Sequence, residues 1–133
     1  MKVIIIEPMK KPVVREIESG LESLQKIVGG CIEVVYPFND PVGLICNEEG
    51  KLNRLPLNRA LYHEGKIYDI LVGTIIVAGL TEDDFGDLPD ELIEKYMDRF
   101  YCGEEFAKID GQIIAVPNIE HLAEKIGYKG IQL

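Results

Sequence analysis

Short β-branched segments bounded by glycine, proline and other turn residues are the feature that most limits how this chain folds. Such segments are typical of strands, and they recur from the first residues to residue 116. Helical patterns interrupt them irregularly, in the order β, α, several strands, α, β, β, α, whereas a doubly wound parallel sheet needs regular alternation. The order therefore predicts an α+β fold with a mixed or mainly antiparallel sheet and helices packed on one face. The expected strands cover residues 3–6, 13–17, 31–36, 42–46, 67–71, 73–78, 106–109 and 112–116.

Three amphipathic helices are expected, because apolar residues recur at helical spacing in three places. Ser19 and Glu22 match a capping box, in which both side chains bond to free N–H groups of the first turn, and Gly29 ends that helix. Pro89 suits the first turn of the second helix. Asn118 caps the third, whose expected inward face is formed by Ile119, Leu122, Ala123 and Ile126.

Turn residues divide the segments between these helices. Residues 47–52 predict a hairpin turn that returns into a second strand. Because Pro56 excludes a central strand beyond it, residues 55–62 are expected to hold a short helical turn. Gly73 marks a bend or bulge, so residues 67–78 are expected to form one bent strand or two separate strands. Asp110-Gly111 predicts a two-residue hairpin turn near the end of the chain.

Negative charge is concentrated in one part of the chain. The sequence carries 14 basic and 23 acidic residues, a net charge of −9, yet residues 81–105 alone hold ten acidic and two basic residues, a net charge of −8. Nucleic acids and anionic membranes select basic surfaces, so the composition argues against direct binding to either. A protein is the expected partner.

Two interpretations of this acidic stretch stay open. Carboxylates on a helix and its preceding loop can imitate the phosphates of DNA and occupy a DNA-binding enzyme. Alternatively, they form the solvated face of an amphipathic helix, opposite an apolar stripe that contains Leu92, Tyr96 and Phe100. That stripe packs on its own chain or on a second copy, which leaves a homodimer open. The candidate acidic surface consists of Asp83, Asp84, Asp87, Asp90, Glu91, Glu94 and Asp98.

The cysteines and the apolar runs point to the cytoplasm. Cys31, Cys46 and Cys102 are odd in number and none are spaced as Cys-x-x-Cys, so we expect reduced, structural thiols and no metal site. The first apolar run is too short for a signal peptide, and no run approaches the roughly 18 residues of a membrane span. We expect a cytoplasmic protein without a membrane segment or a cofactor.

The polar pair Asn58-Arg59 is unusual, because it follows a proline among apolar residues. In one interpretation it forms a ligand or partner site near Tyr62, where the guanidinium would hold a carboxylate or phosphate. In the other it is structural, with Arg59 paired to Asp69 and Asn58 capping a turn. Asn58, Arg59, Tyr62 and Asp69 are therefore the candidate binding residues.

No sequence motif indicates a reaction that the protein could catalyse. Asp69 lies between Tyr68 and Ile70 with no second carboxylate at a spacing that suggests acid–base catalysis. Phosphate-binding loops, dinucleotide fingerprints and paired metal motifs do not occur. The chain is not expected to be an enzyme, although a small enzyme that uses Asn58, Arg59 and Asp69 is kept as an alternative.

Five motifs follow one another in order along the first part of the chain: GG at 29–30, IEVV at 32–35, NEEGKL at 47–52, LPLNRAL at 55–61 and IYDILVGT at 67–74. This ordered series resembles a known family, domain of unknown function family 3846, over about residues 1–80. The resemblance implies a small bacterial, phage or plasmid protein, often from Firmicutes and their mobile elements, and it brings no activity and no site residue.

These observations predict an α+β body over residues 1–80. They also predict an extension over residues 81–133, made of the acidic helix and a ββα unit and packed on the body as one domain. The expected function is that of a cytosolic binding or regulatory accessory protein of a mobile genetic element. An acidic DNA-mimic or anti-defence inhibitor is the second hypothesis.

Overall fold

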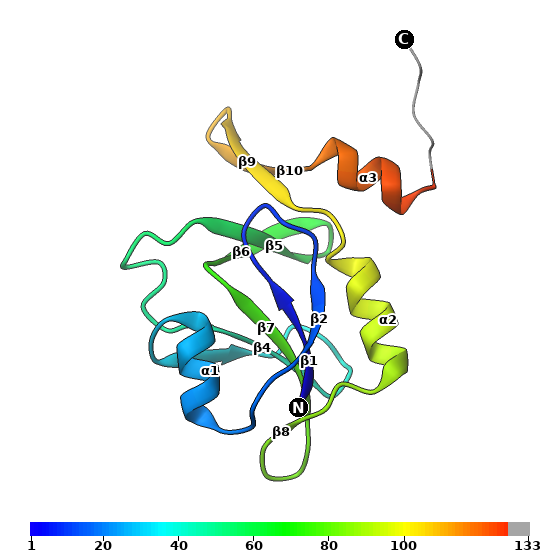
Figure 1. The fold of residues 1–133 in the computed structure, drawn as a ribbon. Helices are drawn as coiled ribbons and strands as arrows, with labels where there is room; N and C mark the ends of the chain where they lie inside the picture. The colour runs from blue at the N-terminus through cyan, green and yellow to red at the C-terminus, as the bar shows by residue number, and fades with distance from the viewer. Residues whose placement is uncertain (128–133) are drawn as a thin grey trace.

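The computed structural model describes residues 1–127. At its centre is a six-stranded antiparallel sheet with the order β2-β1-β7-β4-β3, in which the short β8 also pairs with β7 (Figure 1). The predicted α+β class and the antiparallel sheet are confirmed. The strands are β1 Lys2–Ile6, β2 Val13–Glu16, β3 Ile32–Val35, β4 Val42–Asn47, β7 Ile75–Leu80 and β8 Phe85–Gly86.

Two further pairs of antiparallel strands lie outside this sheet. β5 (Leu57–His63) pairs with β6 (Lys66–Val72), and β9 (Glu104–Ile109) pairs with β10 (Gln112–Pro117). The β9–β10 hairpin is followed by α3 (Ile119–Lys125), and both lie beyond one end of the central sheet (Figure 1). The last part of the described chain therefore projects from the body.

Several turn and cap residues act as their chemistry predicts. Gly29 ends the first helix in the left-handed region, at φ 82°. Asp110 and Gly111 have φ values of 50° and 79°, the type I′ geometry of a two-residue hairpin turn. Asn118 caps α3 by accepting a hydrogen bond from the N–H of His121 at 3.0 Å. The predicted hairpin and the last helix are confirmed.

One helix covers each face of the central sheet. Alternate residues of β1 face opposite ways, so Val3 packs beneath α1 (Leu21–Val28) and Ile4 packs beneath α2 (Asp90–Arg99). The prediction that the helices pack on one face is wrong. The central strands β1, β4 and β7 are buried along nearly their whole length, so both of their faces need cover.

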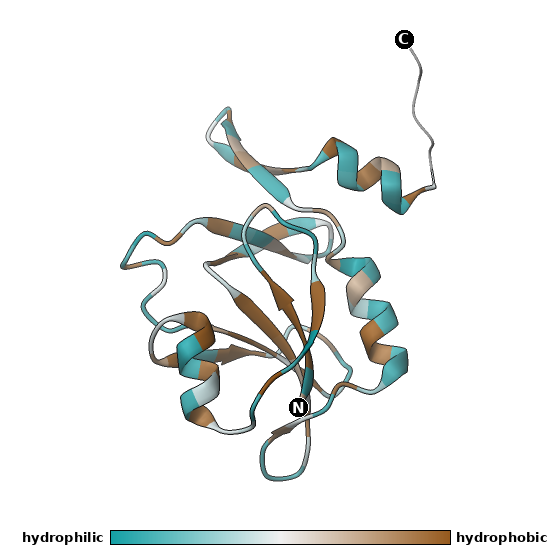
Figure 2. Cartoon of the chain, viewed as in Figure 1, coloured by the Kyte–Doolittle hydropathy of each residue, from teal (hydrophilic) through white to brown (hydrophobic). Residues whose placement is uncertain are grey.

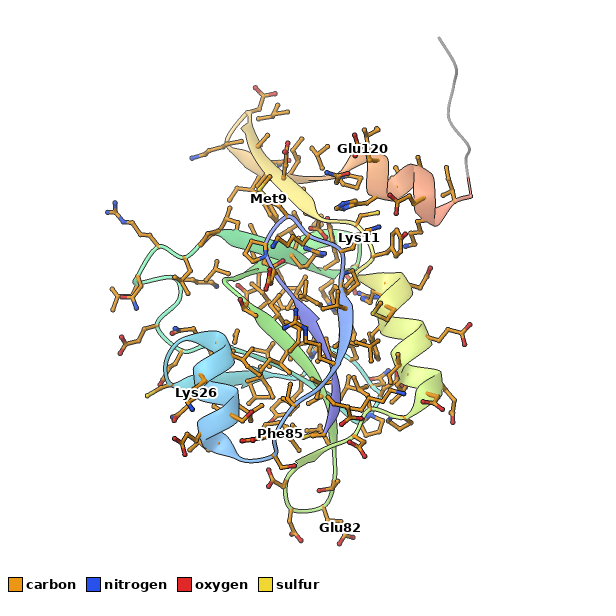
Figure 3. The ribbon with its side chains drawn as sticks, viewed as in Figure 1. Met9, Lys11, Lys26, Glu82, Phe85 and Glu120 are labelled. Carbon is orange, nitrogen blue, oxygen red and sulfur yellow. The ribbon has the colours of Figure 1, made fainter. Side chains whose placement is uncertain are left out.

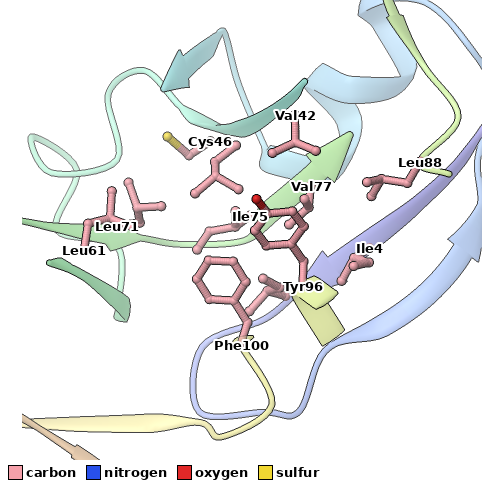
Figure 4. Close-up of a cluster of buried hydrophobic side chains, with 12 residues drawn as sticks. Ile4, Val42, Cys46, Leu61, Leu71, Ile75, Val77, Leu88, Tyr96 and Phe100 are labelled. Atoms are coloured by element: carbon pink, nitrogen blue, oxygen red, sulfur yellow. The ribbon is translucent and has the colours of Figure 1, made fainter. Parts of the chain in front are cut away.

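The apolar stripe of α2 packs on the body of its own chain. Tyr96 and Phe100 are buried in one cluster with Ile4 and other residues of the central sheet (Figure 4). The rings of Tyr96 and Phe38 have centroids 4.8 Å apart, and the Tyr96 hydroxyl donates a hydrogen bond to Oδ2 of Asp40 at 2.6 Å. The stripe is thus part of the core.

Gly73 separates β6 from β7, as the sequence predicts. Its φ of 69° favours glycine, and a Cβ there would lie 2.8 Å from Cδ1 of Leu55. The N–H of Gly73 donates to the carbonyl of Pro56 at 2.8 Å. Residues 67–78 therefore form two strands that belong to different sheets.

Two turn predictions in the first half of the chain are wrong. Ser19 does not cap α1. The N-cap residue is Gly20, which has a φ of 106° and no side chain that could cap the helix, and α1 therefore begins one residue later than predicted. Residues 47–52 do not return as a hairpin. The buried Asn47 side chain donates to the carbonyl of Val28 at 3.2 Å and holds the end of β4 against α1, while the turns after it lead toward β5.

Two predictions about later segments also differ from the structure. Residues 55–62 hold no helical turn, because β5 begins directly after Pro56 as one strand of a two-stranded ladder. The expected inward face of α3 is not buried, since Ile119 is 77% exposed and Ile126 is 66% exposed. Leu122 and Ala123 are only half-buried, so no residue of α3 is fully buried.

Hydropathy follows this arrangement (Figure 2). The central strands β1, β4 and β7 are mostly hydrophobic, and hydrophobic residues also occur on β10 and α3, outside the core. Within residues 1–127, none of the helices has the length and the apolar character needed to cross a bilayer.

Candidate binding groove

Asn58 is completely buried and connects three parts of the chain. Its Nδ2 donates to the carbonyl of Ile6 at 2.9 Å and to the carbonyl of Gly73 at 2.6 Å. The ladder of β5 and β6 shifts register at this position, which turns the Asn58 side chain inward. Asn58 therefore satisfies carbonyl groups at the end of β1 and at the Gly73 bend, and does not cap a local turn.

Arg59 is also completely buried, and all five of its N–H donors have acceptors within the chain. Nη2 donates to the carbonyls of Lys10 at 2.6 Å and Phe100 at 2.9 Å, and Nε donates to Phe100 at 3.3 Å. Nη1 donates to the carbonyl of Asn58 at 3.4 Å and to its side-chain oxygen at 2.8 Å. The guanidinium has no free donor for a ligand.

Glu104 is the carboxylate nearest to this buried charge. Its Oε2 lies 4.0 Å from Nε of Arg59, and its Oε1 accepts a hydrogen bond from the N–H of Ala60 at 3.0 Å. Burial raises the pKa of Glu104, and the Ala60 N–H and the arginine offset part of this rise. Burial likewise lowers the pKa of Arg59, against the pull of Glu104.

Asp69 does not pair with Arg59, so this part of the structural interpretation is wrong. Asp69 forms an ion pair with Lys51 and accepts the N–H of Ile70 at 2.8 Å. The structure thus brings Asn58 and Arg59 together but separates them from the Asp69 ion pair. The geometry gives no support to a catalytic group made of Asn58, Arg59 and Asp69.

A groove of about 950 Å³ lies between β6 and β10, and two of the four candidate residues line it. Tyr62 and Asp69 belong to its walls, whereas Asn58 and Arg59 do not. The β6 wall contains Tyr68, which is 56% exposed, and the β10 wall contains Ile113, which is 48% exposed. The groove, and not the buried polar pair, is the accessible feature of this region.

The chemistry of the groove is mainly apolar with a few charges. Leu57, Tyr62, Tyr68 and Ile113 are all exposed large hydrophobic residues, and they meet in one hollow. Exposed apolar groups gathered around a concave surface are typical of binding sites. Three charged residues line the groove: Lys51, Lys66 and Asp69. Lys51 and Asp69 form an ion pair with each other, so Lys66 gives the groove a net positive charge.

Most of this groove could not be predicted from the sequence. Tyr68, Lys66 and Ile113 do not stand out in it, because the two walls come from hairpins that lie far apart in the chain. One signal was present: residues 113–116 are apolar at consecutive positions, although both faces of β10 are largely exposed. A strand that buries one face alternates apolar and polar residues, and this one does not.

A second, smaller hollow of about 240 Å³ lies on the other side of Tyr62. Glu104, Cys102, Arg99 and Lys125 also line it. Burial raises the pKa of the Tyr62 hydroxyl, with Glu104 contributing further. Tyr62 therefore belongs to both hollows and stands between the groove and the buried ion pair.

Polar contacts attach the base of the β9–β10 hairpin and α3 to the body. Nδ1 of His121 accepts the N–H of Gly103 at 3.0 Å. Oε2 of Glu124 accepts hydrogen bonds from Nζ of Lys11 at 2.7 Å and from the Tyr101 hydroxyl at 2.8 Å. Lys11 lies on the connection between β1 and β2, on the side where α3 is attached (Figure 3). The hairpin is thus fixed at its base.

All seven residues of the candidate acidic surface are exposed, on the loops around β8 and on α2. Some of them have partners in the chain. Asp87 accepts the N–H of Lys2 at 2.7 Å, Asp90 lies 3.5 Å from Nζ of Lys2, and Asp98 lies 3.9 Å from Nζ of Lys125. The carboxylates face solvent opposite the buried stripe of α2, as an amphipathic helix requires.

The remaining reactive side chains are scattered. Cys31 is exposed, Cys46 is buried and Cys102 is half-buried, and all three are free thiols. Burial raises the pKa of the Cys46 thiol to about 11. In the part of the chain that the structure describes, no three histidine, cysteine or acidic side chains lie close enough together to hold a metal ion.

Comparison with known proteins places the chain in a family without assigning it an activity. No curated protein and no solved structure matches it. The profile described as "Domain of unknown function (DUF3846)" matches residues 1–101, which extends the resemblance seen in the sequence through α2. This match covers about three quarters of the 133 residues, and the chain belongs to the DUF3846 family.

Proposed function

We propose that this chain is a small cytosolic binding or regulatory accessory protein of a mobile genetic element, and that it binds a partner protein in the groove between β6 and β10. The observation that carries the proposal is the groove itself, in which exposed Tyr62, Tyr68, Leu57 and Ile113 converge from separate hairpins. Tyrosine is one of the residues that carry most of the binding free energy at protein interfaces, and the buried core of an interface is mainly apolar. The association with a mobile element rests on the resemblance to the family alone.

The composition of the groove favours a protein over a nucleic acid. Its walls are mainly apolar, the charged residues are two lysines and one aspartate, and one of the lysines is already paired. A surface that binds a phosphate backbone needs several free cations in a row. Apolar area with a small number of charges fits the core and rim of a protein interface.

An acidic DNA mimic is the second candidate, and the exposure of all seven carboxylate residues around β8 and α2 favours it. Such a surface would bind a basic protein through charge alone and with strong dependence on salt. It lies on other elements than the groove, so the two candidates can be separated by position.

Site-specific photo-crosslinking tests both candidates in cells that carry the genetic element. A crosslinking amino acid at Tyr68 is expected to join one partner protein, and Ile113→Asp on the facing wall of the groove is expected to abolish that product. The same amino acid at Glu94, on the exposed face of α2, serves as the matched control and is expected to give no product. A crosslinked product from position 94 and none from position 68 would show that the partner binds the acidic surface and not the groove.

A further inference from the structure

The outer edge of β10 presents unpaired main-chain groups. In an antiparallel pair, residues whose N–H and C=O bond to the partner strand alternate with residues whose groups point away. Gln112 pairs with Ile109 across the two-residue turn, so Gln112, Ile114 and Val116 bond to β9. The N–H and C=O groups of Ile113 and Ala115 therefore point away from β9.

A second contact supports this assignment. The N–H of Asn118 donates to the carbonyl of Gly103 at 2.7 Å. Asn118 therefore continues the series of residues with even numbers whose main-chain groups bond toward β9. Pro117, which has no N–H, occupies an outward position, where none is needed. Within residues 1–127 no strand pairs with this edge.

β10 also lacks the charged residues by which edge strands avoid a partner. Natural edges carry charges that oppose strand addition. β2 contains Arg15 and Glu16, and β3 contains Glu33. β10 reads QIIAVP and has no charged residue, with a proline only at its last position. The edge of β10 is therefore suited to accept another strand.

This edge opens onto the groove. Ile113 and Ala115, which carry the outward N–H and C=O groups, both line it, and the opposite wall is β6 with Tyr68. A segment that paired with β10 would therefore lie with its side chains between Ile113 and the tyrosines. Main-chain hydrogen bonds would give affinity, and the apolar walls would select alternate side chains.

Charge indicates what the segment contains. Lys66 lines the groove, and no carboxylate among residues 1–127 forms an ion pair with it, whereas Lys51 is paired with Asp69. An acidic residue in the bound segment would balance Lys66. β10 of a second copy would bring none, because none of its six residues is acidic. The charge therefore favours a partner protein over self-pairing.

We propose that an extended segment of a partner protein adds to β10 as the third strand of the β9–β10 sheet, with apolar residues at alternate positions and an acidic residue beside Lys66. This inference rests on the proposed function, since it specifies how the groove holds its partner. The segment bonds to the main chain of Ile113 and Ala115 and packs against Tyr68 and Tyr62.

The probe is a displayed library of random peptides of about ten residues, the upper length of an ordinary strand, selected on the purified 133-residue chain. We expect enriched peptides with alternating apolar residues and one aspartate or glutamate. A fluorescent copy of one such peptide is then titrated against Ala115→Pro, which removes an outward N–H, and against Ala115→Ser, which keeps it. We expect at least a tenfold loss of affinity for the first variant, little change for the second, and a severalfold loss for Lys66→Ala.

A scan of the peptide itself keeps the test independent of how the variants fold. Methylation of single backbone nitrogens is expected to abolish binding at every second residue of the peptide and to spare the residues between, because only one edge of the added strand meets β10. If Tyr68→Ala weakens binding but methylation has no effect that repeats at every second residue of the peptide, strand addition is overturned and the groove stays the binding site. Strand addition would also be overturned if selection on the wild type enriched no peptide more strongly than selection on Ala115→Pro. Dimerisation that Ala115→Pro abolishes would assign the edge to a second copy and overturn the partner segment.

Discussion

The side-chain oxygen of Asn58 accepts a hydrogen bond from Nη1 of the neighbouring Arg59 at 2.8 Å, and both side chains are completely buried. Two adjacent strand residues normally face opposite sides, but the register shift in β5 lets this pair act together. Between them they bond to carbonyls of Ile6, Lys10, Gly73 and Phe100. The pair is the polar joint at which β1, β5, the Gly73 bend and α2 meet.

Replacement of Asn58 tests this joint. Asn58→Ala leaves the carbonyls of Ile6 and Gly73 and one donor of Arg59 without their partner, so we expect the free energy of unfolding to fall by about 3 kcal/mol. Urea unfolding followed by circular dichroism measures the loss. The control is Asn53→Ala in an exposed turn, which is expected to cost less than about 0.5 kcal/mol. Equal losses for both variants would contradict a structural role for Asn58.

Glu104 gives stability a pH dependence of definite sign. Because burial raises its pKa in the folded state, the folded protein holds this proton more tightly than the unfolded chain does. The contribution of the protonated group is complete below about pH 4.5, its ordinary pKa, and is lost as the pH rises through the higher folded value. Glu104→Gln cannot ionise, so across this range its free energy of unfolding should fall less with rising pH than that of the wild type.

The measurement compares urea unfolding of wild type and Glu104→Gln at closely spaced pH values from 4 upward. Glu105→Gln is the matched control, since Glu105 is the next residue in the chain and its side chain is exposed. Parallel curves for wild type and Glu104→Gln would show that the Glu104 carboxyl is not desolvated in the folded protein.

Gly73→Ala tests the bend between the two sheets. The substitution puts a Cβ at a φ of 69° and 2.8 Å from Cδ1 of Leu55, so strain and a clash act together. Gly65→Ala is the control, because Gly65 has a similar φ of 78° but open space around it. We expect Gly73→Ala to lower the midpoint of urea unfolding further, by the equivalent of about 1 kcal/mol or more. The same loss of unfolding free energy in both variants would mean that the Leu55 side chain moves away from the added Cβ without destabilising the fold.

Phe100→Ala tests the packing of α2 on the central sheet. Phe100 is buried in the same cluster as Ile4 and Tyr96, and its truncation is expected to cost about 3 to 5 kcal/mol of unfolding free energy. Leu52→Ala removes an exposed apolar side chain and is expected to cost little. A small loss for Phe100→Ala would favour an α2 that folds apart from residues 1–80.

Much of the fold follows from local chemistry that the sequence displays. Gly29 ends α1, Asn118 starts α3 and Asp110-Gly111 forms the hairpin turn, because in each case a single residue type meets a local geometric demand. The side of the sheet that each helix covers depends on contacts between distant segments, and there the prediction is wrong. The fully apolar character of β7 was the available sign that both faces are covered.

The candidate site shows the same division. The oddity of Asn58-Arg59 was visible in the sequence, but its cause is tertiary, since the acceptors of Arg59 include Lys10 and Phe100. Tyr62 and Asp69 line the groove together with residues such as Ile113 that no local pattern joins to them. The boundary at residue 80 and the role of the acidic surface stay predictions.

The arginine at the joint also makes closure of the core depend on residues that lie far apart in the chain. Two of its acceptors, the carbonyls of Lys10 and Phe100, lie 49 residues before it and 41 residues after it. A chain that ends before Phe100 lacks that carbonyl and also lacks Glu104. Burial of a cation that lacks acceptors is strongly unfavourable, so the guanidinium of such a chain stays hydrated. Closure of the body around Arg59 therefore needs residues from both sides of residue 80.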